Sequence, residues 1–431
     1  MFDKENIYDF ITNEGEERIC DAIDEKQCTN VPGNFLKNSL SGFCSKLAEQ
    51  LVSPGVTLPW ILSMVGASSG FAGLLVPIKN AGSLIPQLLV SAKIRAFSKR
   101  KYFWAYSAFF QALMVGLMLL SFLIFDGDTA GYIIVGALFL FSIASGVASV
   151  SFKDVMAKTI PKGRRGRLLA TRATGGGILT LLAGLLLYFF LQQADSRLPF
   201  IILIGTSAIL WMGAGFFFSI IKEEDGATKG GRSPINELSN GWQLFLNDSN
   251  LRNFILTRAM LMAIPLTQPF FIIYGKEITG ASVSGLGLLV IASGIAGFIS
   301  SPFWGKFADR SSRKLMMIIA VIGIVNIMLV MGFDLLNDKF KTITVFAPLI
   351  LLNMMVHGGA RLSRKTYLAD YAPENERPLY ISFSNTFIGL FTIIAAGVGF
   401  IAELFSIQVL FFFFIGMLLI SIMFSKALKE L

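Results

Sequence analysis

Long apolar stretches recur along the whole chain and constrain its fold more than any other feature of the sequence. Each has roughly the 20 residues that an α-helix needs to cross the hydrocarbon core of a bilayer. Hydrophobic residues make up 54% of the chain and charged residues only 15%, against about 25% in an average soluble domain. Open sheets cannot span a bilayer, and these stretches are too long for barrel strands. The sequence therefore predicts an all-α membrane protein with about twelve transmembrane helices. The expected spans are 42–63, 69–92, 102–125, 131–152, 169–192, 198–221, 252–275, 281–304, 315–333, 342–363, 380–403 and 406–425.

The charges between these stretches alternate along the chain. The gaps at 92–101 and 153–167 are rich in Lys and Arg, whereas the gaps at 64–69 and 126–130 contain neither. This alternation is typical of the positive-inside rule and not of a nucleic-acid-binding face. The net charge of +9 therefore does not indicate a nucleic-acid partner. We expect a protein embedded in the lipid bilayer of the plasma (bacterial inner) membrane, with both termini in the cytoplasm.

An internal repeat divides the chain into two halves of six helices each. The segments around Pro161 and Pro373 are similar at an offset of 212 residues, and those that begin at Gly66 and Gly280 are similar at an offset of 214. A basic pair near residue 100 recurs at an offset of 213. Nearly the same offset at three places predicts a duplication with both halves in the same orientation. The expected domains are a cytoplasmic segment 1–35, a six-helix bundle 36–221, a cytoplasmic linker 222–251 and a six-helix bundle 252–431.

The stretch WGKFADRSSRK, residues 304–314, carries a family signature between two spans. The pattern Gly-x-x-x-Asp-Arg-x-x-Arg-Lys is formed by Gly305, Asp309, Arg310, Arg313 and Lys314. Together with the two parallel six-helix halves, this stretch resembles the major facilitator superfamily over roughly residues 40–425. The resemblance implies two pseudo-symmetric bundles, a central substrate site and transport by alternating access, and we expect a monomer.

The same resemblance assigns these loop residues to a gate. We expect Gly305 to let two helix ends approach closely. The resemblance implies that Asp309 docks near residues 165–169, at the start of the fifth helix, when the cytoplasmic side is closed, inside a network of the neighbouring cations. Plain positive-inside anchoring is the alternative role of these cations. The corresponding stretch of the first half, SAKIRAFSKRK, keeps only Arg100 and Lys101, which argues against a symmetric gate.

Several polar and charged residues lie inside the predicted spans, where a charge is costly and indicates a functional site. The candidates for substrate binding or coupling are Lys46, Glu49, Gln50, Lys79, Asn80, Arg258, Asn353, His357 and Arg361. Cations outnumber anions among them, which favours an anionic or zwitterionic substrate. Glu49 and His357 are the candidates for proton coupling. Several candidates also have an alternative role. In these roles, Lys46 and Arg258 extend to the membrane–water interface, or Lys46 and Glu49 form a purely structural pair. Arg361 belongs to the cytoplasmic end of its helix, and His357 is a packing residue.

Other chemistry finds little support in the sequence. GGARLSRKT, residues 358–366, approaches a phosphate-binding loop but has Arg364 in place of the second glycine and follows a membrane helix instead of a strand. Cys20 and Cys28 are spaced unlike a zinc site, and a cytoplasmic location would keep both as reduced thiols. We therefore expect no enzyme, no metal and no cofactor.

The leading hypothesis is a secondary active transporter, proton-coupled, for a small organic anion or amphipathic solute. The alternatives are a drug or metabolite efflux antiporter and a non-transporting membrane scaffold or sensor.

Overall fold

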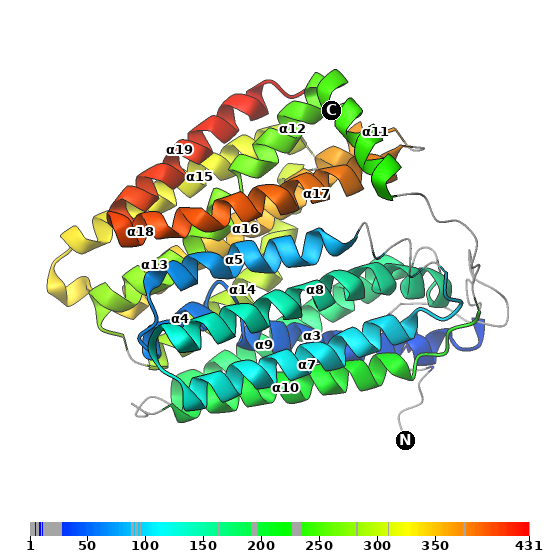
Figure 1. The fold of residues 1–431 in the computed structure, drawn as a ribbon, viewed down its shortest axis with the longest axis horizontal. Helices are drawn as coiled ribbons and strands as arrows, with labels where there is room; N and C mark the ends of the chain where they lie inside the picture. Colours follow the sequence, from blue (N-terminus) through cyan, green and yellow to red (C-terminus); the bar gives the residue numbers. More distant parts are fainter. Residues whose placement is uncertain are drawn as a thin grey trace.

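The computed structural model of the chain is a bundle of helices, most of which run side by side (Figure 1). It describes residues 5, 8, 9, 11, 28–87, 90, 94, 96–161, 164–190, 197–225, 234–281, 283–308, 310–373 and 376–430. All regular secondary structure in these ranges is helical. Ten segments of the described chain are long and apolar enough to cross a membrane. The expected all-α membrane fold is confirmed.

The helices follow the predicted order of two six-span bundles. The first contains α3 (Val31–Leu51), α4 (Thr57–Met64), α5 (Ser69–Leu84), α7 (Lys101–Ile124), α8 (Gly127–Thr159), α9 (Arg165–Phe190) and α10 (Leu198–Ser219). Helix α11 (Pro234–Asn247) connects it to the second. The second contains α12 (Ser249–Met260), α13 (Ala263–Thr279), α14 (Val283–Ala308), α15 (Ser312–Gly332), α16 (Ile343–Tyr371), α17 (Arg377–Ala396), α18 (Phe400–Leu404) and α19 (Ile407–Lys426). Single 3-10 turns occur at η1 (Phe333–Leu335), η2 (Asp338–Phe340) and η3 (Gly397–Gly399).

The first span of each bundle is interrupted, which corrects the prediction of one continuous helix over 42–63. Helix α3 ends at Leu51, and the chain turns through Ser53, Pro54 and Gly55 before α4 begins. Pro54 has no N–H to donate, and Gly55 tolerates the turn, so the α-helical hydrogen-bond ladder stops there. In the second bundle α12 and α13 are separated by two residues. Interrupted helices free backbone groups, and inside a membrane this is tolerated where the backbone is buried or lines a cavity.

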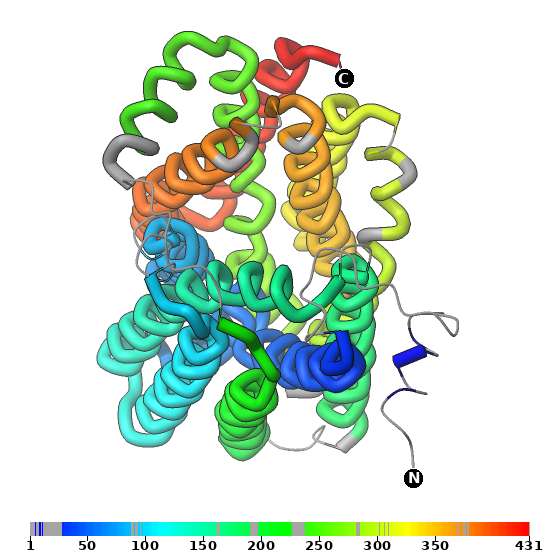
Figure 2. The backbone as a smooth tube through the Cα atoms, turned by 90° about the vertical axis from the view of Figure 1, so that its right-hand side faces the viewer, coloured from blue at the N-terminus to red at the C-terminus, as the bar shows by residue number. Residues whose placement is uncertain are grey.

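Two helix pairs join the bundles. Helix α9 packs along α14, and α5 packs along α17 and η3. A Cβ atom on Gly287 would lie 2.7 Å from the backbone nitrogen of Tyr188, and one on Gly73 would lie 2.6 Å from the Cα atom of Gly399. Only glycine permits such close backbone approach. Seen along the spans, the first bundle lies below the second and meets it along these pairs (Figure 2).

The ends of the bundle differ in their loops. We call the end that carries the 64–69 and 126–130 loops the non-basic end, and the opposite end, which carries the 153–167 loop and α11, the basic end (Figure 1). The bundles touch at the non-basic end, where the Lys276 ammonium donates to the Ser63 hydroxyl at 2.9 Å. The same ammonium lies 5.4 Å from the ring centroid of Trp60. These contacts join the two bundles at the non-basic end.

Two details of the polar segments differ from expectation. Residues 222–251, predicted as a connector, include the α-helix α11. Cys28 is disulfide-bonded, so the expectation of a reduced thiol is wrong for this residue, and Cys20 lies outside the described residues. Tyr8, from the segment 1–35, is buried with its ring 5.3 Å from that of Phe35. Part of the N-terminal segment is therefore packed against the first helix.

Candidate substrate cavity

A cavity of about 350 Å³ lies where the two bundles meet. Its walls come from α3, the break that follows it, and helices α5, α13, α14 and α16. Of the nine predicted candidates, the cavity brings together Lys46, Glu49, Gln50, Lys79, Asn80, His357 and Arg361. The volume falls within the range of small-molecule sites.

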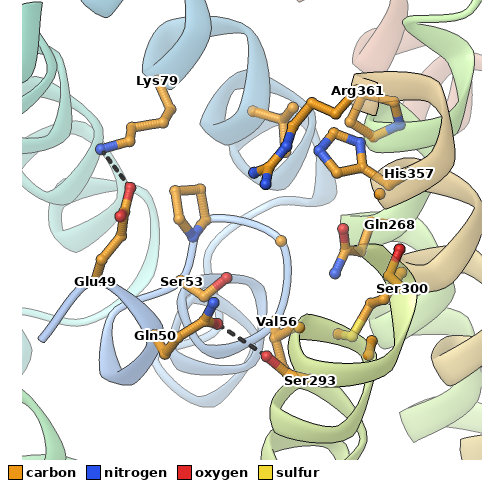
Figure 3. A pocket seen from close by; sticks show the side chains of 18 of the residues that line it. Glu49, Gln50, Ser53, Val56, Lys79, Gln268, Ser293, Ser300, His357 and Arg361 are labelled. Atoms are coloured by element: carbon orange, nitrogen blue, oxygen red, sulfur yellow. Dashed lines mark hydrogen bonds and ion pairs between the residues drawn. The ribbon is translucent and has the colours of Figure 1, made fainter. Parts of the chain in front are cut away.

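Glu49 is held between two lysines on one side of the cavity. Its Oε1 atom lies 3.3 Å from the Lys79 Nζ, and its Oε2 atom lies 3.6 Å from the Lys46 Nζ (Figure 3). Lys46 and Glu49 are three residues apart on α3, as the sequence predicted for a pair, whereas Lys79 arrives from α5. The Lys79 ammonium also lies 4.4 Å from the ring centroid of Phe141, on α8. This cation–π contact and the carboxylate together stabilise a charge within a membrane span.

A hydrogen bond crosses the floor of the cavity between the bundles. The Ser293 hydroxyl, on α14, donates to the Gln50 Oε1 atom at 2.9 Å (Figure 3). Gln50 lies one residue after Glu49 on α3, so the ion-pair cluster and the inter-bundle contact share one helical turn. A hydrogen bond therefore links the second bundle to the helical turn that carries the carboxylate.

Helix α16 supplies the opposite wall with His357 and Arg361. The two residues are four apart, which places them on one face of the helix, and both side chains point toward the cavity (Figure 3). The Nδ1 atom of His357 is buried and has no hydrogen-bond partner within the described residues. The Arg361 side chain is exposed to the cavity, and in the described part of the chain it forms neither an ion pair nor a hydrogen bond. The Arg361 guanidinium and the His357 ring are thus available to form hydrogen bonds with a ligand.

Two predicted site residues do not line the cavity. Arg258 is buried and donates to the Ser384 hydroxyl and to Oδ1 of Asn385, both at 2.7 Å, which ties α12 to α17. Asn353 is buried and donates to the backbone oxygen of Ile264 at 3.4 Å. The charge pattern placed Arg258 within a predicted span, but it did not indicate the direction in which the side chain leaves the helix.

Several lining residues were missed because they carry no charge and have no charged residue nearby in the sequence. Gln268 lies on α13, and Ser300 lies on α14, seven residues after Ser293. A Cβ atom on Gly55 would lie 2.8 Å from the Cδ atom of Gln268, so this amide abuts the break that follows α3. The position of Gln268 between two prolines of an interrupted span was the one signal that could have identified it.

The family signature between α14 and α15 is tied to the end of its own bundle. Arg313 forms an ion pair with Glu430, and the Lys314 Nζ lies 3.4 Å from the same carboxylate. The Ser311 hydroxyl donates to it at 2.6 Å. These hydrogen bonds and the nearby cations hold the pKa of Glu430 below its ordinary value. Two of the loop cations thus pair with a carboxylate that follows α19, and the predicted network around Asp309 stays a prediction.

The remaining signature residues have different outcomes. A Cβ atom on Gly305 would meet nothing within 4 Å among the described residues, so the expected close helix approach at Gly305 is wrong for this conformation. Arg310 is exposed. Asp309 lies outside the described residues, so its docking stays a prediction.

The first bundle has the corresponding arrangement despite its degenerate signature. Glu223 follows α10 as Glu430 follows α19, and its side chain is fully buried. Its carboxylate accepts hydrogen bonds from the backbone N–H groups of Arg100 and Lys101 at the start of α7, the shortest at 2.8 Å. The Lys158 Nζ lies 2.9 Å from it. An anion at a helix N-terminus is a favourable pairing, so both bundles fasten this loop with a carboxylate that follows their sixth span.

Two related helical bundles around a polar, charged cavity define a membrane transport architecture. The profile described as Major Facilitator Superfamily matches residues 39–277 and 262–430. The chain belongs to the Major Facilitator Superfamily, which confirms the resemblance found in its sequence. It is therefore an integral membrane protein of a transporter family, and the prediction of a transport protein instead of an enzyme agrees with this membership.

Individual relatives are distant. An uncharacterized protein of Mycobacterium tuberculosis is 24% identical over 260 residues, which cover 59% of this chain and 49% of that protein. The multidrug resistance protein MdtG of Citrobacter koseri is 31% identical over 118 residues, or 26% of this chain and 27% of that protein. The chain spans about half the length, or less, of these curated relatives.

Solved structures share the fold. The nucleoside transporter NupG, solved as a mutant, has a TM-score of 0.70 at 13% identity and covers 92% of this chain and 100% of its own. A D-xylose-proton symporter has a TM-score of 0.62 at 16% identity, with 92% and 97% covered.

Proposed function

We propose that the protein is a secondary active transporter that works by alternating access, coupled to protons, for a small organic anion or amphipathic solute. Family membership supports transport, and the charges in the cavity support the choice of substrate. The observation that carries the proposal is Arg361, a cation that faces the cavity without a protein partner in the described part of the chain. Lys46 and Lys79 add two cations, against the single carboxylate of Glu49.

The cation excess continues along α16 toward the basic end. Lys365 lies one turn beyond Arg361, and its side chain is also exposed. Lys153, on α8, contributes to the electrostatic environment of Lys365 from the other bundle. A group of cations attracts anions to its vicinity and speeds their entry. An anionic cargo would therefore exchange with the compartment at the basic end.

Proton coupling follows from the ion pairs of Glu49. A substrate anion that binds to Lys79 or Lys46 competes with the carboxylate for these cations. It thereby weakens the attraction that keeps Glu49 ionised, so substrate and proton bind together. His357, on the facing wall, is the second candidate for the proton, because its Nδ1 atom has no partner among the described residues. Arg258 and Asn353 have structural roles in this scheme.

The test is transport by purified protein in liposomes, with a panel of small organic anions and a pH-sensitive dye in the lumen. Arg361→Gln removes one charged contact with the anion, worth about 1.5–3 kcal/mol, so KM rises by roughly 10- to 100-fold. Arg361→Lys keeps the charge and recovers part of the affinity. Glu49→Gln keeps anion binding and abolishes the pH change.

Two outcomes contradict parts of the proposal. Flux that is indifferent to both Glu49→Gln and His357→Gln refutes the coupling assignment. No flux with any anion, drug or lipid overturns the transporter and favours a scaffold or sensor. An efflux antiporter is the second candidate, favoured by the short similarity to multidrug resistance proteins. It predicts that protons move opposite to the solute.

We also propose that the protein lies in a bacterial inner membrane and that its basic end and both termini face the cytoplasm. The two bundles form domains 36–221 and 252–431. Asp309 closes the cavity at the basic end. The Lys- and Arg-rich loops support the orientation. The disulfide of Cys28 is the observation against it, because disulfides are rare in the cytosol. Labelling of an introduced Ser98→Cys from each side tests the orientation. Labelling from the periplasm alone would reverse it.

A further inference from the structure

Helix α11 presents an apolar face that the described part of the protein leaves about half exposed. Leu238, Trp242 and Leu246 recur every four residues, so they form one stripe along the helix. Their side chains are 44%, 50% and 55% exposed. An exposed stripe of two leucines and a tryptophan is unfavourable in water.

The other faces of α11 have different surroundings. At about 100° per residue, the face centred on Gly241 turns toward α17. A Cβ atom on Gly241 would lie 2.3 Å from the Phe383 ring, and the Phe245 ring stacks on that of Phe387 with centroids 5.2 Å apart. The third face is polar and exposed, and it contains Ser239, Asn240, Gln243 and Asn247. Around the helix there are thus three faces: one that packs on α17, one that is apolar and exposed, and one that is polar and exposed.

The position of α11 identifies what meets the apolar face. The helix lies at the basic end and runs across the direction of the spans (Figures 1 and 2). It packs on Phe383 and Phe387 in the first turns of α17. Farther along the same side of α17, which continues as a membrane span, Leu390, Ile393 and Ile394 are exposed. The stripe therefore continues the lipid-facing surface of α17 at the level where that span enters the bilayer.

We propose that α11 is an interfacial anchor whose Leu238, Trp242 and Leu246 side chains insert into the head-group boundary of the bilayer leaflet at the basic end. A helix with separate apolar and polar faces lies in the plane of this boundary, and tryptophan is enriched there. The sequence of α11, PINELSNGWQLFLN, contains no Lys or Arg. Its binding therefore rests on apolar burial and not on attraction to anionic lipid. Through Gly241 and Phe245 the anchor holds α17, which packs against α5 of the other bundle.

The tryptophans of the chain make this inference directly measurable. The chain contains five, and Trp60, Trp104, Trp211 and Trp304 are all buried, at 2–6% exposure. In liposomes that contain lipids brominated near the head group, Trp242 should be quenched, and Trp242→Phe should remove most of that quenching. Lipids brominated at the chain ends should quench less, because the helix lies at the boundary. Addition of anionic lipid or of salt should leave the quenching unchanged.

A second pair of variants keeps Trp242 and changes its surroundings. Leu246→Asn should reduce the lipid quenching and increase quenching by aqueous iodide, whereas Gln243→Asn, on the polar face, should change neither. If Trp242 in the wild-type protein is quenched by iodide and not by brominated lipid, the anchor is refuted. Protection from both quenchers that is lost on dilution also refutes it, because a second protein copy then covers the face. Neither outcome depends on whether the protein transports an anion.

Discussion

Arg258 provides a strong test of the difference between a buried cation that binds substrate and one that joins helices. Its guanidinium donates to Ser384 and Asn385, both at 2.7 Å, and lies outside the cavity. A hydrogen bond from a charged donor contributes about 1.5–3 kcal/mol in soluble proteins, whereas interhelical hydrogen bonds in a membrane average about 0.6 kcal/mol. Because this donor is charged and 6% exposed, we expect a coupling energy of about 1–2 kcal/mol between Arg258 and Asn385.

The measurement is a double-mutant cycle that compares Arg258→Met, Asn385→Ala and the variant with both changes. The free energy of unfolding of each protein is measured by titration with SDS in mixed micelles. The single variants should each destabilise the protein, and the double variant should lose less than their sum. Additive losses would mean that the two side chains do not interact. A large loss of substrate affinity in Arg258→Met, with unfolding unchanged, would refute the structural assignment and restore Arg258 to the binding site.

Three further predictions concern the loops and the contact between the bundles. Glu223→Gln should lower the free energy of unfolding by about 3 kcal/mol, because it breaks a buried, hydrogen-bonded ion pair. The control Asp225→Asn removes one partner of an exposed ion pair and should lower it by less than about 1 kcal/mol. Equal losses in the two variants would contradict this reasoning. The pKa of Glu430 is lowered in the folded protein, so its stabilising effect is present above the ordinary carboxyl pKa of about 4.3 and is lost as the pH falls through the lower folded value. Thermal unfolding midpoints measured from pH 3 to pH 7 should show this loss in the wild type and less of it in Glu430→Gln, and parallel curves would refute it. Gly73→Val should place a methyl-bearing carbon 2.6 Å from the Cα atom of Gly399 and force the two bundles apart. A cysteine introduced by Gln268→Cys should then be labelled faster from the non-basic end. Unchanged labelling would show that the contact between Gly73 and Gly399 does not close the cavity at that end.

The sequence predicted part of the cavity because a charge inside an apolar span is conspicuous. Lys46, Glu49 and Lys79 were identified in this way, and the structure brings them together. Gln268 and Ser293 were missed because uncharged polar residues are common in membrane helices, and neither has a charged neighbour such as those that drew attention to Gln50 and Asn80. The break after α3 was missed as well, since Ser53-Pro54-Gly55 lies within a stretch whose average composition still suits a span.

The sequence by itself determined the helical membrane fold, the order of the spans, the family and the position of each charge along the chain. These are properties of local composition and spacing, which a bilayer constrains strongly. Only the tertiary structure decided which charges share a space. Arg258 and Arg361 are both cations within spans of the second bundle, yet one faces α17 and the other faces the cavity. The direction of a side chain around its helix is fixed by how residues far apart in the chain pack, and contacts such as those of Gly73 with Gly399 and of Gly287 with Tyr188 set that packing.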